Sequence, residues 1–137
     1  MVKLDANQAQ EFLDSIFSGN TLVVEETGEM YARMRMKIGE RHLRPGNTVS
    51  GPSMMGLADA AFYIATLAQI GPVALAVTTN LNINFLRKPG PTDIIAIAKI
   101  FKLGQRLSIG EVSIFSEGQD ELVAHATVTY SIPPDRS

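Results

Sequence analysis

An apolar segment at residues 50–69, SGPSMMGLADAAFYIATLAQ, limits the possible folds of this chain more than any other feature. It predicts a helix of about five turns that is apolar on nearly every side, and such a helix has to be enclosed by the rest of the protein. Asp59 is its only charged residue, and no other acidic or basic residue lies between Arg44 and Arg87. Because a buried charge loses its hydration, Asp59 must either be held by specific polar partners or face a cavity in which its charge is used.

The same region raises the alternative of a membrane-spanning helix, because residues 60–77 form a nearly continuous apolar run of comparable length. Gly71-Pro72 interrupts this run, and the residues after it alternate as in a β-strand. We therefore interpret residues 50–69 as the core helix of a folded domain, with no membrane partner. The N-terminal residues lack the apolar region of a signal peptide, which favours a cytoplasmic protein.

The length and composition of the chain indicate one globular domain over residues 1–137. There is no cysteine, which excludes disulfides and thiol catalysis, and the two histidines, His42 and His125, lack the spacing of metal ligands. The formal net charge is −2 and no run of Lys and Arg exceeds two residues, so a nucleic-acid partner is not expected. We expect neither a metal ion nor a resident cofactor.

The rest of the chain predicts one more helix and six strands. Residues 7–18 have the apolar spacing of a short amphipathic helix, for which Asn7 and Gln10 resemble a capping box. Strands are predicted at residues 21–26, 30–38, 73–86, 93–102, 107–116 and 121–132, and a loop at residues 39–49. Strands joined by short turns imply an antiparallel sheet, and a helix that is apolar on all sides suggests that the sheet curls around it, an α+β architecture.

Two details of the predicted strands bear on the site. Strict alternation over residues 73–86 places Val77 on one face with Leu81, and Thr78 on the other face with three asparagines. The apolar residues of segment 107–116 change phase at Gly110, which predicts a β-bulge at that glycine.

Several short motifs follow one another along the chain. Ser50-Gly51-Pro52 begins the long helix and Leu57-Ala58-Asp59 lies on it; segments 82–87 (NINFLR), 103–106 (LGQR) and 123–126 (VAHA) follow. In this order the motifs and elements resemble the hotdog fold, and especially its acyl-CoA thioesterase branch related to phenylacetate-degradation thioesterases. The resemblance covers about residues 20–132. It implies an antiparallel sheet wrapped around a long central helix.

The resemblance also implies an activity, the hydrolysis of an acyl- or aryl-acyl-CoA thioester to a free acid and coenzyme A. It implies a homodimer or a dimer of dimers, a homotetramer, with active sites at the subunit interface. Asp59 matches the carboxylate that acts as nucleophile or general base, and Gly51 matches the glycine whose N–H polarises the thioester carbonyl. Thr78 matches a Ser or Thr that helps to place the nucleophile or water, and Asn47 is the nearest candidate for a polar residue that the loop before the helix contributes.

The start of the long helix departs from the family. Relatives usually have His-Gly-Gly, whereas Ser50 here replaces the histidine and Pro52 removes a backbone N–H. A helix N-terminus still offers free N–H groups and the positive end of the helix dipole. Gly51 and Asp59 lie about 12 Å apart along one helix axis, which is too far for both to act on one carbonyl. A site that combines them needs the helix of a second subunit alongside.

Substrate contacts are expected from two further sets of residues. The apolar lining would suit a medium acyl chain or an aromatic ring and includes Met54, Met55, Phe62 and Tyr63, with Ser50 at the helix start. Basic residues near strand ends would suit the phosphates of coenzyme A: Arg87, Lys88, Lys102 and Arg106. For each of these, a solvated turn charge is the alternative.

Three other interpretations stay open at this stage. Asp59 would have a purely structural role if it caps backbone groups or pairs with an arginine. A non-catalytic acyl-CoA-binding hotdog protein is the main alternative to an enzyme. A hotdog dehydratase or hydratase is a further alternative, although it usually needs a histidine where Ser50 stands.

Overall fold

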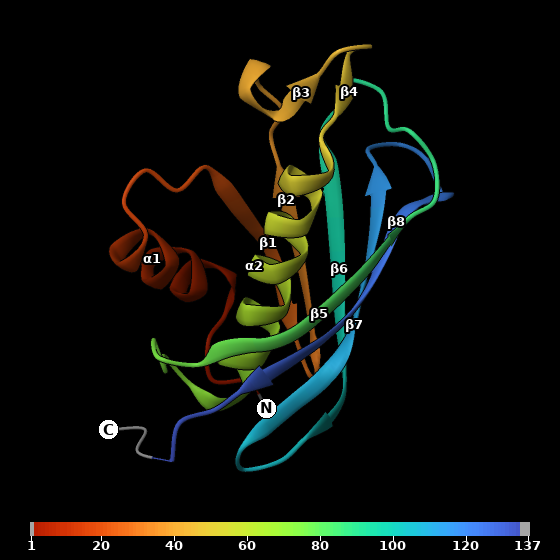
Figure 1. Cartoon of the computed structure of the whole chain (residues 1–137). Helices are drawn as coiled ribbons and strands as arrows, with labels where there is room; N and C mark the ends of the chain where they lie inside the picture. Colours follow the sequence, from red (N-terminus) through yellow and green to blue (C-terminus); the bar gives the residue numbers. More distant parts are fainter. Residues whose placement is uncertain (1, 135–137) are drawn as a thin grey trace.

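The computed structural model describes residues 2–134, which form two α-helices, one 3₁₀ turn and eight strands (Figure 1). The elements in chain order are α1 (Ala6–Ile16), β1 (Leu22–Gly28), β2 (Tyr31–Met36), the 3₁₀ turn (Glu40–His42), β3 (Leu43–Arg44), β4 (Thr48–Val49), α2 (Gly51–Ile70), β5 (Val77–Phe85), β6 (Ile94–Leu103), β7 (Leu107–Ser116) and β8 (Leu122–Ser131).

Six of the strands form one antiparallel sheet in the order β1-β2-β6-β7-β8-β5. The sheet curls around α2, and α1 lies beside them next to β1 (Figure 1). Strands β1 and β5 are therefore the two edges, and the apolar helix is enclosed as its composition requires. This arrangement confirms the predicted α+β hotdog fold. The loop predicted at residues 39–49 contains a small hairpin, β3-β4.

The core is closely packed where α2 meets β7. Phe62 is fully buried on α2, and its ring lies against Gly110. A β-carbon at Gly110 would come within 2.7 Å of the Phe62 ring and would collide with the carbonyl oxygen of Lys99. Gly110 is therefore needed for close packing, and Phe62 is a core residue.

The β-bulge predicted at Gly110 is wrong. Ser108, Gly110 and Val112 all lie buried on the same face, so β7 keeps its phase throughout. The register shift is on the neighbouring strand, between Ile100 and Lys102 of β6. The sequence pattern misled because the small polar Ser108 faces inward, where its hydroxyl hydrogen-bonds Thr66 of α2 at 2.9 Å.

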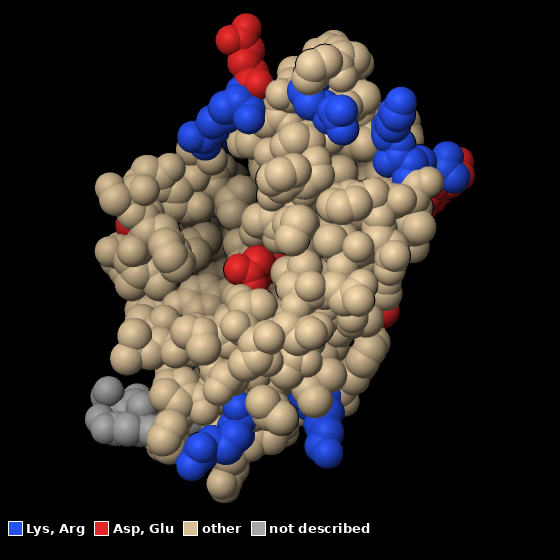
Figure 2. Space-filling model, in the orientation of Figure 1, with Lys and Arg blue, Asp and Glu red and all other residues tan. Residues whose placement is uncertain are grey.

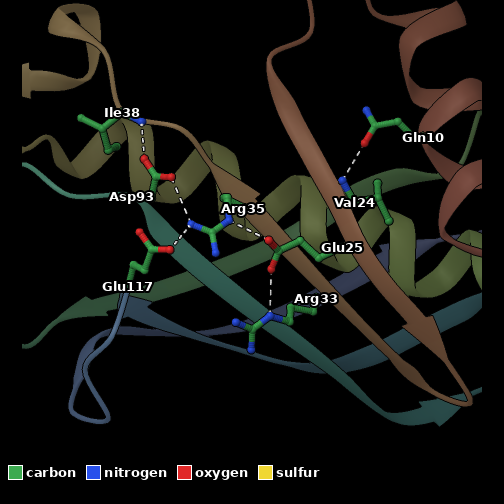
Figure 3. Close-up of polar contacts among 8 residues, drawn as sticks. All are labelled: Gln10, Val24, Glu25, Arg33, Arg35, Ile38, Asp93 and Glu117. Carbon is green, nitrogen blue, oxygen red and sulfur yellow. Dashed lines mark hydrogen bonds and ion pairs between the residues drawn. The ribbon is translucent and has the colours of Figure 1, made fainter.

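The start of α1 also differs from the prediction. Asp5 caps the helix, and its side chain and that of Gln8 form the reciprocal capping box. Gln10 instead contacts the edge strand β1. Its Oε1 accepts the Val24 N–H at 2.7 Å (Figure 3). Its Nε2 donates to the Leu22 carbonyl at 3.1 Å. The side-chain amide thus satisfies backbone groups of β1 that have no neighbouring strand.

Arg35 on β2 joins three carboxylates on the outer side of the sheet (Figure 3). Its guanidinium contacts Glu25 at 2.6 Å, Glu117 at 2.8 Å and Asp93 at 3.0 Å. Burial alone would raise the pKa of Glu25, but the hydrogen bonds from Arg35 and Arg33 lower it below its usual value. The cluster connects β1 and β2 to the turn that precedes β6 and to the turn that follows β7. It also explains why arginines alternate with apolar residues in the second predicted strand.

Within residues 2–134, α2 is the one helix whose length and mean hydropathy of 1.2 would let it cross a membrane. In this structure 61% of its most apolar stretch is buried against the sheet. The core helix of a folded domain has the same composition, so the segment alone is weak evidence for a membrane span.

Candidate active site

Asp59 lies in the middle of α2, and two hydroxyl groups of the sheet hold one of its carboxylate oxygens. Thr78 Oγ1 of β5 donates to Asp59 Oδ1 at 2.6 Å, and the Tyr130 hydroxyl of β8 donates to the same oxygen at 2.8 Å. The Tyr130 hydroxyl also lies 3.1 Å from the main-chain oxygen of Asp59. Among the described residues, Oδ2 has no hydrogen-bond partner and no cation pairs with the carboxylate.

A register shift in β5 brings Thr78 to this position. Thr78 pairs with Tyr130, and Leu81 pairs with Val128, so Thr79 is an extra residue in β5. Because paired residues share a face, Thr78 and Leu81 both point towards the helix. Without the shift, strict alternation would turn Thr78 outward with the asparagines. The predicted division of faces along residues 73–86 is therefore wrong at Val77 and Thr78.

Asp59 faces a cavity of about 520 Å³. The walls come from α1 and the segment after it, from α2, and from β5 and β8, and are mainly apolar: Leu13, Phe17, Asn20, Leu22, Gly56, Ala60, Tyr63, Ala74, Ala76, Val77, Thr78 and Tyr130. In Figure 2 a single acidic group lies in a hollow on this face, surrounded by uncharged residues, and the basic residues lie towards the two ends of the molecule. Among the described residues that line the cavity there is no Lys or Arg, and Asp59 is the one charged group.

The two tyrosines in this cavity stay protonated at physiological pH. Burial raises the pKa of Tyr130 far above its usual range and the nearby Asp59 carboxylate raises it further, although the hydrogen bond with Thr78 acts in the opposite direction. Burial also raises the pKa of Tyr63 to about 12. Tyr130 is thus available as a hydrogen-bond donor to the carboxylate.

Sequence reasoning missed Tyr130. A signal was present: it ends the alternating segment 121–132 on the same face as the apolar residues, and a buried tyrosine hydroxyl needs a partner. Asp59, as an isolated carboxylate in an apolar helix, needed a donor. Nothing in the sequence pattern, however, shows that β8 passes next to that turn of α2.

The start of α2 forms a second candidate region around Gly51. The Ser50 side chain caps the helix by accepting the Ser53 N–H at 3.3 Å, and Pro52 has no N–H. The Gly51 N–H is therefore the donor of the first turn that has no hydrogen-bond partner among the described residues. The Phe85 ring at the end of β5 lies so close that a β-carbon on Gly51 would be 3.2 Å from it.

A cavity of about 580 Å³ opens beside Gly51, separate from the cavity at Asp59. It is lined by α2 residues Gly51, Pro52 and Met54, by the β3-β4 hairpin, and by residues 85–89. Three of its side chains are basic: Arg44, Arg87 and Lys88. This end of the helix thus combines a free backbone donor with positive charge.

The other predicted site residues are distributed as follows. Asn47 lies in the turn of the β3-β4 hairpin with φ 59°, outside both cavities. Met54 lines the Gly51 cavity, whereas Met55 is an exposed residue of α2 that lines neither. The prediction that Phe62 lines the substrate site is wrong, because its side chain is fully buried in the core. Ser50 serves as a helix cap.

The predicted basic cluster divides between two ends of the molecule. Arg87 and Lys88 lie beside Gly51, and Arg87 pairs with Glu121 at 2.5 Å. Lys102 and Arg106 line a separate hollow at the β6-β7 turn. Within one chain, therefore, these residues do not form one phosphate site.

The two histidines take no part in either region. Nδ1 of His42 accepts the Gly39 N–H at 2.9 Å, and burial and the nearby Arg41 lower its pKa, so this ring is neutral. His125 lies 2.8 Å from Glu111 on the outer face of the sheet. Among residues 2–134, no group of three His, Asp or Glu side chains is arranged to hold a metal ion.

Comparison with known proteins identifies the family. The sequence profile of the thioesterase superfamily matches residues 46–123, which include Gly51, Asp59 and Thr78. The chain belongs to the thioesterase superfamily. Membership supports the hydrolysis of thioesters in general and fits a carboxylate that faces an apolar cavity.

Proteins of similar structure or sequence agree with this assignment. A candidate thioesterase from Silicibacter sp. TM1040 is 42% identical, with 98% of this chain and 95% of that one aligned and a TM-score of 0.90. The phenylacetic acid degradation protein PaaI from Thermus thermophilus, solved as a mutant, is 26% identical over 88% of this chain and 100% of its own, with a TM-score of 0.73. A candidate esterase from Thermoplasma acidophilum is 23% identical over 120 residues, 88% of this chain and 89% of its own.

Proposed function

We propose that this thioesterase hydrolyses an acyl- or aryl-acyl-CoA thioester to the free acid and coenzyme A. The observation that carries the proposal is Asp59, a carboxylate with one oxygen held by two hydroxyl donors and the other without a partner among the described residues, in an otherwise uncharged cavity. A structural aspartate in an apolar setting is expected to have both oxygens paired, because an unpaired polar atom there costs free energy. Here one oxygen remains for chemistry, and its surroundings suit an uncharged acyl group.

The second element of the site, an N–H at the carbonyl oxygen, is proposed to come from Gly51 of a partner subunit. Asp59 contacts Thr78 near one end of β5, and Gly51 contacts Phe85 at the other end. β5 is an edge of the sheet, and exposed apolar residues lie at or next to both of its ends: Leu75, Val77, Phe85 and Leu86. Antiparallel pairing of two β5 edges about a two-fold axis near Leu81 would place each Asp59 opposite the partner's Gly51.

In this arrangement the two ends have different tasks. The free N–H and the positive end of the helix dipole at Gly51 stabilise the negative charge that develops on the carbonyl oxygen. Asp59 either attacks the carbonyl carbon, forming an anhydride that water then hydrolyses, or takes a proton from the water that attacks. In both cases the thiolate of coenzyme A leaves and water supplies the oxygen of the acid. Thr78 keeps the carboxylate in place.

Substrate contacts follow from the same pairing. The acyl group would lie in the cavity at Asp59, whose aromatic and aliphatic walls suit a medium chain or an aromatic ring. Arg87 and Lys88 lie beside Gly51 and would bind phosphates of coenzyme A. Pairing of the opposite ends of β5 would also bring Arg106 and Lys102 of one subunit towards Arg87 and Lys88 of the other. We infer a homodimer or dimer of dimers that works in the cytoplasm without a resident cofactor.

Release of free thiol from a panel of aliphatic and aromatic acyl-CoA thioesters tests the proposal. We expect turnover with at least one class, and a loss of about 10³-fold in kcat for Asp59→Asn with the dimer and melting temperature retained. Asp120→Asn, which changes an exposed turn carboxylate, is the control and should keep wild-type activity. Unchanged activity of Asp59→Asn would refute the mechanism, and tight binding of acyl-CoA without turnover would favour the non-catalytic alternative.

A further inference from the structure

We propose that Tyr130 is a positioning residue that occupies Oδ1 of Asp59 together with Thr78, so that Oδ2 is the oxygen that reacts. The inference rests on the proposed function, because it assigns the reacting atom of the same site. It concerns a residue outside the stretch of the chain, residues 46–123, that the family profile matches.

The contacts around Asp59 are unequal for its two oxygens. Oδ1 accepts from Thr78 at 2.6 Å and from Tyr130 at 2.8 Å, which leaves little room for a water or a substrate atom. Oδ2 has no partner among the described residues. No side-chain nitrogen or oxygen of those residues is both buried and unpaired, so the unpaired Oδ2 is not buried. Oδ2 is therefore open to the cavity, where an acyl carbonyl or a water would meet it.

Contacts on several sides hold the Tyr130 side chain in place. Its ring packs against Phe62 and Tyr63, with ring centroids 5.8 Å apart in each pair, and its backbone lies between β7 and β5. Its hydroxyl lies within reach of both the main-chain oxygen and Oδ1 of Asp59. Contact with two atoms of the same residue restricts rotation of the aspartate side chain, so the direction of Oδ2 is fixed before substrate arrives.

Tyr130 remains a hydrogen-bond donor because burial raises its pKa. The other tyrosine of the cavity does not compete for Asp59, since the Tyr63 hydroxyl donates to the Ala74 carbonyl at 3.1 Å. Among the described residues, the wall from α1 and the segment after it contributes no titratable side chain. Tyr130 and Thr78 are therefore the side-chain donors to Asp59 in the described part of the chain.

Tyr130→Phe tests this inference because it keeps the ring and its packing. We expect kcat to fall about tenfold, because the loss of a hydrogen bond to a charged group lowers a rate by about that factor. KM should stay within about twofold of the wild-type value. The matched control is Tyr31→Phe, which removes a tyrosine hydroxyl near the Glu26 carboxylate of β1, outside the cavity, and it should leave kcat and KM unchanged.

A second variant and a second readout keep the test decisive. Thr78→Val removes the other donor to Oδ1 and should lower kcat by a similar factor with little change in KM. At one fixed pH, the ¹³C resonance of the labelled Asp59 carboxyl, assigned with Asp59→Asn, should change its chemical shift and broaden in both variants whether or not the enzyme turns over, because the side chain has lost a donor that restricts it. A wild-type protein without turnover but with this NMR change would refute the proposed function alone. An unchanged kcat and an unchanged carboxyl resonance in Tyr130→Phe would overturn the role of Tyr130.

Discussion

The two ends of strand β5 differ in every property that matters for thioester hydrolysis. Near Val77 lies a carboxylate with two hydroxyl donors in an apolar cavity, and near Phe85 lies a helix N–H, unpaired among the described residues, with basic side chains. One end can attack or deprotonate, and the other can stabilise negative charge. Each chain thus has both chemical functions but holds them at opposite ends of one strand. In the proposed dimer, a second copy reverses the strand and brings the two halves together into one site.

The largest effect should come from keeping the two copies apart. Asn80→Lys with Asn82→Lys places positive charges on the outer face of β5 close to the proposed two-fold axis, where they would face their symmetry mates. We expect a folded monomer with unchanged far-UV circular dichroism and no detectable turnover. Analytical ultracentrifugation with the activity assay measures this. Thr127→Lys on the neighbouring strand β8, exposed on the same face, is the control and should remain a dimer.

The Gly51 end can be tested by removing its N–H. Gly51→Pro places proline at the first helical position, which tolerates it, and eliminates the donor. We expect kcat to fall by about 10²- to 10³-fold, as for the loss of one donor to a developing oxyanion. Gly51→Ala adds the same β-carbon next to Phe85 but keeps the N–H, so it separates crowding from the lost donor. Equal losses in the two variants would mean that this N–H has no role in catalysis.

The smallest effect is expected from the basic residues beside Gly51. Arg87→Gln with Lys88→Gln should raise KM for an acyl-CoA several-fold and leave kcat nearly unchanged, because phosphate contacts act equally in the ground state and the transition state. The difference from wild type should shrink as salt is added. Steady-state kinetics at two ionic strengths checks both points. A change confined to kcat would remove these residues from coenzyme A binding.

Much of this architecture could be predicted from sequence. The apolar helix with its single charge, Asp59, indicated both the core and the candidate carboxylate, because hydrophobicity and charge are local properties of the chain. The antiparallel sheet followed from alternating segments joined by short turns. Gly51 was identified at the helix start, and its separation of about 12 Å from Asp59 led to the prediction that a site combining them needs a second subunit.

The remaining features depend on contacts between distant segments. The extra residue at Thr79 turns Thr78 towards Asp59, and strict alternation gives no sign of it. Tyr130 reaches Asp59 only because β8 lies next to β5. Ser108 faces inward to bond Thr66, which disguised the phase of β7. In each case a hydrogen bond joins residues far apart in sequence, and such residues give no joint pattern.

The central claim is that each active site takes Asp59 from one subunit and the Gly51 N–H from the other. Co-expression of Asp59→Asn and Gly51→Pro chains with different affinity tags allows the mixed dimer to be isolated, and its acyl-CoA hydrolysis to be compared with both inactive homodimers. One of its two sites would then contain both native groups, so we predict about half of the wild-type activity. A folded mixed dimer as inactive as the homodimers would contradict the claim, because both groups would then have to come from one chain.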